Sequence, residues 1–237
     1  MFAQKHHPIN HPIVNARLSK LRQTSTTAKE FREGIYDISL ILGVEASRNL
    51  EEEAFDGRTP VAPFVGSTIK PRIGLAPILR AGLGMTDALL NLFPAAPVYH
   101  LGIFREKVTL QAVEYYNKLP AGDPTVDLVF LLDPLIATGG TACAAIHMLK
   151  EWTVPEEKIK LLCVLASKTG LDQVRQAYPG VEIWTAATDP ELTPEGLISP
   201  GLGDTVSDIQ FDLQFLDHVA YDELKGDRLY NTLKEPL

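Results

Sequence analysis

The residues FLLDPLIATGGT, at positions 130–141, form the sharpest chemical pattern in this chain. Apolar residues lead into Asp133, and the small-residue turn 137–141 follows before a helical stretch. Glycines let a backbone approach an anion closely, and successive N–H groups at a helix start then point toward it. Thr138 and Thr141 add hydroxyl donors, and Asp133 stands where a carboxylate can accept from sugar hydroxyls. The pattern favours a phosphorylated sugar as ligand; the alternative is a strand-to-helix turn whose glycines serve geometry alone.

Two arginines follow other apolar stretches and could bind the same kind of ligand. Arg80 comes directly after RIGLAPIL and precedes Gly82 and Gly84, and Arg105 follows LGIF. A guanidinium on a tight turn suits a pyrophosphate, because its fork of N–H groups matches phosphate oxygens. The alternative for Arg80 is a surface arginine that caps a turn.

Strands and helices must alternate along the chain to bring these residues together. From residue 72 onward, apolar runs alternate with helical stretches; the runs are 72–79, 96–104, 126–133, 158–167 and 181–188. Continuous apolar strands are typical of a parallel sheet that is covered on both faces. Right-handed crossovers place the carboxyl ends of such strands at one edge. The sequence therefore predicts an α/β fold with its ligand site at that edge.

The first seventy residues follow a different pattern. Residues 1–12 are predicted to form an extended arm, and 13–48 are predicted to be helical. Thr27 and Glu30 have the spacing of a capping box ahead of an apolar run. Residues 49–70 are acidic and then rich in glycine and proline, which indicates a loop with short hairpin strands.

Composition excludes several classes of protein. The 237 residues carry 22 basic and 30 acidic side chains, for a net charge of -8. This balance argues against nucleic acid or an anionic membrane surface as the main partner. No apolar run is long enough to span a membrane. Cys143 and Cys163 both lie in apolar stretches, so we expect free thiols in a reducing compartment, the cytoplasm.

The 130–141 stretch resembles the 5-phosphoribosyl-1-pyrophosphate (PRPP) loop of the type I phosphoribosyltransferases. Its Asp-Pro-Leu-Ile-Ala-Thr-Gly-Gly form is similar to the variant found in uracil phosphoribosyltransferases. Further stretches resemble motifs of that family, in the same order: HPIVNARLSKLRQTSTTAKEFRE (11–33), PILRAGLGM (77–85), EYYNKLP (114–120) and WTAATDPELTPEGLISPGLGD (184–204).

This resemblance implies a single domain over residues 1–237, with a type I phosphoribosyltransferase core, an N-terminal helical arm and a mobile hairpin. The implied reaction converts uracil and PRPP into UMP and pyrophosphate, a step of pyrimidine salvage. Mg²⁺ would be held through PRPP and water rather than directly by the protein. The family commonly forms homodimers or homotetramers, and GTP is an effector of some relatives, so both are expected partners.

The resemblance also assigns roles to individual residues. Arg80, Arg105 and Asp204 would act at the reacting centre. The residues implied to bind PRPP are Arg80, Arg105, Asp133, Pro134, Leu135, Ile136, Ala137, Thr138, Gly139, Gly140, Thr141 and Asp204. Those implied to bind uracil are Ile198, Gly203, Asp204 and Thr205. Tyr115 and Tyr116 would lie on a flap that closes over PRPP, although two half-buried hairpin tyrosines are the plainer interpretation.

The sequence departs from the family pattern near its end. In the family, the Gly-Asp-x turn runs directly into Gly-Asp-Arg. Here Gly203-Asp204-Thr205 is separated from Gly226-Asp227-Arg228 by residues 206–225, which we interpret as an insertion. Thr205 also stands where relatives more often have alanine.

Three other functions stay open at this point. One is a phosphoribosyltransferase for another base, which the LISPGLGD segment speaks against. Another is a regulator that senses PRPP or a nucleotide on the same fold. The third is a paralogue that has lost activity, which the interrupted C-terminal motif makes worth considering.

Overall fold

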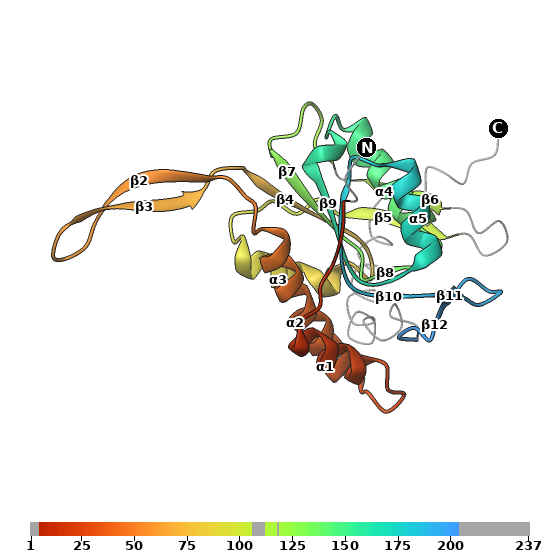
Figure 1. Cartoon of the computed structure of the whole chain (residues 1–237). Coiled ribbons are helices and arrows are strands. Elements are labelled where there is room, and N and C mark those ends of the chain that lie inside the picture. The colour runs from red at the N-terminus through yellow and green to blue at the C-terminus, as the bar shows by residue number, and fades with distance from the viewer. Residues whose placement is uncertain (1–4, 106–111, 118, 204–237) are drawn as a thin grey trace, which may run out of the picture.

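A computed structural model describes residues 5–105, 112–117 and 119–203 of the chain, and an eight-stranded sheet lies at its centre (Figure 1). The spatial order of its strands is β1 (His6–Pro8), β10 (Glu182–Asp189), β9 (Ile159–Ser167), β7 (Leu128–Leu132), β4 (Ile73–Leu79), β5 (Leu101–Arg105) and β6 (Ala112–Asn117), with β8 (Leu135–Ile136) also paired to β9. Every pair is parallel except β5 with β6. The predicted parallel α/β core is confirmed.

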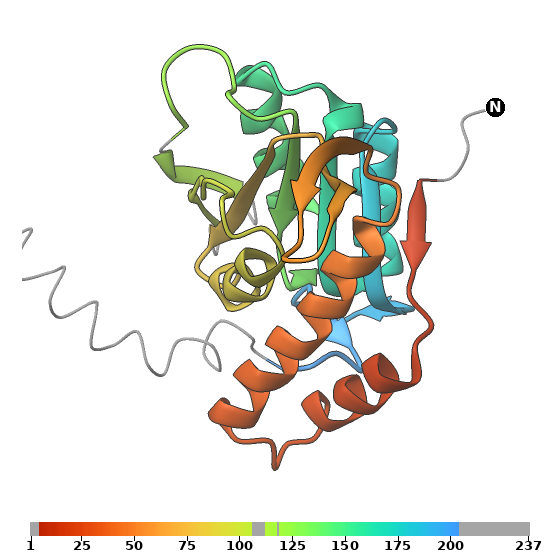
Figure 2. The same cartoon turned by 90° about the vertical axis from the view of Figure 1, so that its left-hand side faces the viewer.

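Helices cover both faces of this sheet, as Figures 1 and 2 show. They are α1 (Pro12–Leu21), α2 (Ala28–Ala46), α3 (Leu83–Leu92), α4 (Gly140–Glu151) and α5 (Lys168–Ala177), with a short 3₁₀ turn at Glu156–Lys158. Successive side chains of a strand point to opposite faces. In β7, Leu131 accordingly packs in the apolar cluster of α4 and α5, whereas Phe130 and Leu132 pack in that of α1, α2 and α3. Both faces of the sheet are thus shielded from water here, which explains the continuous apolar runs of the strands.

The N-terminal region differs from its prediction in the helical stretch and in the extended arm, and it agrees with the prediction at the capping box. The stretch predicted to be helical is two helices, because the Ser/Thr-rich turn between α1 and α2 satisfies backbone groups with side chains. The predicted capping box is present: the Thr27 hydroxyl accepts from the Glu30 N–H at 3.3 Å, and the Glu30 carboxylate accepts from the Thr27 N–H at 2.9 Å. The extended arm contributes β1, which pairs with β10 along the edge of the sheet.

A long hairpin projects from the body of the molecule (Figure 1). Its strands, β2 (Glu52–Arg58) and β3 (Pro63–Ile69), are antiparallel partners over seven residues each, longer than predicted. A second small hairpin, β11 (Glu191–Leu192) with β12 (Ile198–Ser199), follows β10. Within the part of the chain that the structure describes, no helix is both long and apolar enough to cross a membrane.

The parallel strands end together at one edge, where the predicted functional motifs gather. β4 ends just before Arg80, and β7 ends just before Asp133. β9 ends at Ser167, and β10 ends at Asp189. Residues far apart in the sequence therefore meet at this carboxyl edge, which is where ligands bind in open parallel sheets.

Candidate active site

The loop after β7 folds around a small pocket at the carboxyl edge of the sheet. The pocket has a volume of about 120 Å³ and is lined by Asp133, Leu135, Ile136, Ala137, Thr138, Gly139, Thr141 and Ala142. Gly139 has a φ of +88°, in the left-handed region that glycine adopts without steric cost. Helix α4 begins at the next residue, Gly140. The loop amides and the helix start thus belong to one turn, the geometry that binds anions.

Contacts with the start of α5 hold this loop on one side. The Ser167 hydroxyl, which caps α5, donates to the Ala137 carbonyl and accepts from the Gly170 N–H at 2.8 Å. Gly139 and Gly170 also pack closely: a Cβ on Gly139 would stand 2.7 Å from the Gly170 carbonyl oxygen. Because α5 holds one side of the loop, the loop amides are ordered before any ligand arrives. Sequence reasoning missed Ser167 and Gly170, although a serine three residues before the amide that it caps is a usual helix-start signal.

The Asp133 carboxylate lies almost completely buried at the base of the pocket. Burial raises its pKa to about 7, and a long hydrogen bond from the Leu135 N–H, at 3.4 Å, opposes the rise only in part. A carboxylate that is costly to bury and has a single hydrogen-bond donor among the described residues is poised to gain partners from a ligand. Hydroxyl groups of a sugar are suitable donors.

This burial predicts a pH-dependent gain in stability when Asp133 becomes asparagine. The folded state holds the Asp133 proton up to about pH 7, whereas the unfolded chain releases it near 3.8. The stability that this group contributes is therefore fully present below pH 3.8 and is lost as the pH rises to about 7. Over this range the free energy of unfolding falls by up to about 4 kcal/mol. Asp133→Asn should raise the Tm of the ligand-free protein at pH 8, and much less at pH 5. Thermal melts at both values measure this, with Asp87→Asn at an exposed position of α3 as control. A Tm difference that is equal at both pH values would contradict the burial argument.

Arg80 is exposed and follows β4 through a cis peptide bond. The turn that carries it is packed against β7, because a Cβ on Gly82 would stand 2.5 Å from the Leu132 carbonyl oxygen and 2.6 Å from the Ile78 nitrogen. Glycine is therefore required at 82, and its contact fixes the Arg80 turn next to the strand end that leads into Asp133. Arg105 is the last residue of β5, which pairs in parallel with β4. Both arginines thus belong to the carboxyl edge.

Tyr115 and Tyr116 lie on β6, the antiparallel partner of β5. Both side chains are exposed, at 53% and 40%. Gly102 of β5 leaves the space that they need, because a Cβ there would stand 2.5 Å from the Cβ of Tyr116. β5 and β6 form the two strands of the predicted hairpin, and the role of the two tyrosines, as a flap or as half-buried side chains, stays a prediction. The closing movement stays a prediction.

The segment predicted to recognise the base follows β12 as a sharp turn. Ile198 is half-buried, the peptide bond before Pro200 is cis, and Gly201 and Gly203 have φ values of +68° and +82°. The turn that was predicted from the two glycines and the proline is therefore present. It lies beyond the end of β10, the strand that ends at the same edge as β4, β7 and β9.

A family profile described as uracil phosphoribosyltransferase matches residues 8–212 of the chain. The chain belongs to the uracil phosphoribosyltransferase family. A uracil phosphoribosyltransferase of Roseiflexus castenholzii is 48% identical over 196 residues, which cover 82% of this chain and 92% of the relative. A uracil phosphoribosyltransferase of Lactococcus lactis subsp. cremoris is 42% identical over 197 residues, covering 83% and 93%.

Among solved structures, the AQ2163 protein from Aquifex aeolicus is similar to this chain, with a TM-score of 0.80 and 29% identity. The match covers 86% of this chain and 97% of that protein. The predicted fold class, a type I phosphoribosyltransferase core, and the family membership inferred from motifs are therefore both confirmed.

Three elements of the predicted uracil phosphoribosyltransferase site fall outside the described residues. They are Asp204, Thr205 and the segment 206–225, which was interpreted as an insertion. The family match ends at residue 212, within that segment. The roles of Asp204 and Thr205, the insertion and the single-domain assignment all stay predictions.

Proposed function

We propose that this chain transfers the phosphoribosyl group of PRPP to uracil, giving UMP and pyrophosphate. The observation that carries the proposal is the loop 133–141 in a chain of this family: a left-handed glycine, a helix start and a buried carboxylate surround one pocket. This combination suits a 5′-phosphate next to ribose hydroxyls.

In the proposed reaction, a bond forms between a uracil ring nitrogen and the anomeric carbon of PRPP. The bond from that carbon to the pyrophosphate oxygen breaks, and pyrophosphate departs with the bonding electron pair. The ring nitrogen loses its proton to the solvent. Positive charge grows on the sugar while negative charge grows on the leaving group, so the protein contributes mainly positioning and electrostatic stabilisation.

The described residues divide this work among them. The amides and hydroxyls of 137–141 would bind the 5′-phosphate, and Asp133 would accept from the ribose hydroxyls. Arg80 and Arg105 would stabilise the departing pyrophosphate. We further propose that Asp204 aligns the two substrates and that Thr205 contacts uracil, with Ile198 and Gly203 on the same turn. Tyr115 and Tyr116 would exclude water when the β5–β6 hairpin covers PRPP.

We propose Mg²⁺ as the cofactor. Among the residues that the structure describes, no three His, Cys, Asp or Glu side chains lie close enough to form a metal cage. The proposed ion would be held mainly by the PRPP phosphates and water, the ligands that Mg²⁺ prefers. When bound, the ion supplies charge neutralisation on the pyrophosphate. Arg80 and Arg105 would contribute further positive charge to the same pyrophosphate group.

A direct assay tests this function. The protein is incubated with labelled uracil, PRPP and Mg²⁺, and UMP formation is followed. Formation of UMP supports the proposal, and parallel reactions with hypoxanthine and adenine test the alternative of another base. A PRPP-sensing regulator would bind PRPP in calorimetry without forming UMP. Addition of GTP to the same assay tests our further proposal that GTP is an effector.

We also propose that the chain forms a homo-oligomer, a dimer or a tetramer, through the β2–β3 hairpin. A two-stranded hairpin without a core behind it is marginally stable on its own. This one carries exposed apolar side chains, namely Phe55, Val61, Phe64, Val65 and Ile69. Contact with a second copy would bury them.

Val65→Asp is expected to weaken this association. Val65 is 72% exposed, so an aspartate there costs little in an isolated chain but places a charge in an apolar contact. Light scattering during size-exclusion chromatography should give a lower mass for the variant than for the wild type. Val44→Asp, on the exposed face of α2, is the control and should leave the mass unchanged. If Val65→Asp also leaves the mass unchanged, the hairpin does not form the interface.

Finally, we propose a cytoplasmic location for the protein. Both of its cysteines, Cys143 and Cys163, are unpaired, and Cys163 is fully buried in the apolar core. Free thiols of this kind are typical of reducing compartments.

A further inference from the structure

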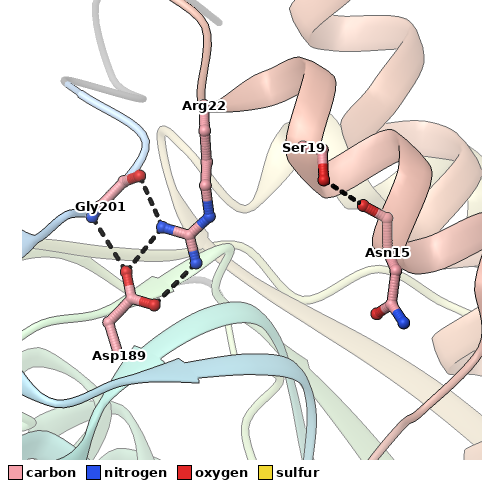
Figure 3. Close-up of polar contacts among 5 residues, drawn as sticks. All are labelled: Asn15, Ser19, Arg22, Asp189 and Gly201. Atoms are coloured by element: carbon pink, nitrogen blue, oxygen red, sulfur yellow. Dashed lines mark hydrogen bonds and ion pairs between the residues drawn. The ribbon is translucent and has the colours of Figure 1, made fainter.

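A cluster of Arg22, Asp189 and Gly201 joins the N-terminal helices to the turn after β12 (Figure 3). Nη1 and Nη2 of Arg22 donate to the two carboxylate oxygens of Asp189, both at 2.7 Å. Nη1 also donates to the Gly201 carbonyl oxygen at 2.9 Å. The Gly201 N–H donates back to Asp189 at 2.9 Å. The three residues therefore form a closed ring of hydrogen bonds.

Charge and burial make this ring a strong contact. The Asp189 side chain is 7% exposed and that of Arg22 is 25% exposed. Burial would raise the pKa of Asp189, but the Arg22 guanidinium and the Gly201 amide hold it below its ordinary value. The carboxylate is therefore ionised at neutral pH, and bidentate arginine–carboxylate contacts are among the strongest hydrogen bonds in proteins.

The ring fixes the orientation of one residue in the base-recognition turn. Both backbone polar groups of Gly201 are bound, its N–H by Asp189 and its carbonyl by Arg22. Gly201 has a φ of +68°, and a Cβ there would collide with the Ile198 carbonyl oxygen. Ile198 and Gly203, two of the residues assigned to uracil, stand on either side. The position of Gly201 thus sets where both can present their backbone groups.

We propose that Arg22 and Asp189 are positioning residues for uracil binding, acting through Gly201. The proposal rests on the proposed function, because it assigns the turn 198–203 to the base. It separates the two halves of the site. The PRPP half is supported by Ser167, the N-cap of α5, and by Gly170 of α5, and the uracil half is held by Arg22 at the end of α1. Loss of the ring should therefore affect one substrate more than the other.

Arg22→Lys is the variant that tests the proposal. Lysine keeps the charge but has no planar fork, so it cannot bind both Asp189 oxygens and the Gly201 carbonyl together. We expect the KM for uracil to rise about tenfold or more, the size expected for a lost charged hydrogen bond, while the KM for PRPP stays within about twofold. Asp189→Asn, which keeps the shape of the side chain, should give the same split and serves if Arg22→Lys folds poorly.

Arg72→Lys is the control, at a bidentate pair that is more exposed, with 63% for Arg72 and 42% for Asp127. Arg72 also makes a bidentate pair, donating to Asp127 at 3.0 and 2.8 Å, and Asp127 likewise accepts a backbone N–H. This pair lies before β4 and β7 begin, at the opposite end of the sheet. Arg72→Lys should leave both KM values unchanged.

The outcomes separate the two proposals. Wild-type protein that forms no UMP would refute the proposed function itself. If the wild type is active but both variants change the two KM values equally, or lower only the Tm, the positioning role is refuted. Arg22 and Asp189 would then serve only the stability of the fold. A selective rise in the KM for uracil in both variants, without one in Arg72→Lys, would support it.

Discussion

Gly139→Ala is expected to lower kcat/KM for PRPP by about 100-fold, because misplacement of a binding loop by roughly 1 Å can cost that much. An alanine at a φ of +88° is strained from the outset. Its Cβ would also stand 2.7 Å from the Gly170 carbonyl oxygen and 3.3 Å from the Cβ of Gln173. Both neighbours belong to α5, and moving this packed helix would cost free energy. The loop must therefore move, and its amides no longer converge on the phosphate.

Gly122→Ala separates the loss of the loop from the cost of backbone strain. Gly122 has a similar φ of +90°, but no heavy atom lies within 4 Å of its Cβ position. Both variants should lose some thermal stability, and only Gly139→Ala should lose PRPP affinity. Calorimetric titration with PRPP and steady-state kinetics measure the two effects. Equal PRPP affinities in the two variants would mean that this loop does not hold the phosphate.

Arg80→Ala is expected to lower kcat/KM for PRPP by about 10²- to 10³-fold, which corresponds to roughly 2.7–4 kcal/mol for one preorganised donor. The physical reason is the negative charge that grows on pyrophosphate as it leaves. Arg80 is exposed, and Gly82 fixes its turn against β7, so the side chain can be removed without disturbing the core. The affinity for uracil should change little, because Arg80 is proposed to act on the pyrophosphate of PRPP and not on the base.

Arg48→Ala is a suitable comparison for Arg80→Ala. Arg48 is an exposed arginine at the end of α2, where it pairs with Glu45 at 2.7 Å. Steady-state kinetics with varied PRPP should show wild-type values for Arg48→Ala and the large loss for Arg80→Ala. Arg80→Lys should fall between them, since lysine keeps the charge but not the fork. Turnover of Arg80→Ala within about threefold of the wild type would remove Arg80 from the site, given the losses expected of a transition-state contact.

Local patterns in the sequence predicted the core of this protein well. The apolar runs that became β4, β7 and β9 are buried on both faces, so their composition alone indicates a parallel sheet, whereas β10 also carries partly buried residues and an exposed one. The turn 137–141 combines glycine, hydroxyl side chains and a helix start within a few residues. Features of this kind depend on residues that are adjacent in the sequence, and they can therefore be predicted from the sequence.

Contacts between distant residues were beyond the reach of those patterns. The Ser167 hydroxyl meets the Ala137 carbonyl only because β8 and β9 pair side by side. Arg22 and Asp189 are 167 positions apart, and nothing in either local sequence indicates a partner. β1 was predicted only as an extended arm, since its strand character comes from pairing with β10.

The sequence by itself determined the chemistry of this site: which residues carry charge, where glycines open a turn, and which strands must be buried. The tertiary structure decided how that chemistry is held. A buried carboxylate with a raised pKa at Asp133, a loop braced by Ser167, and a turn held by Arg22 and Asp189 all require elements from different parts of the chain to meet. The physical reason is that desolvation and hydrogen-bond geometry are properties of packed neighbours, and packing is settled only when the whole sheet has formed.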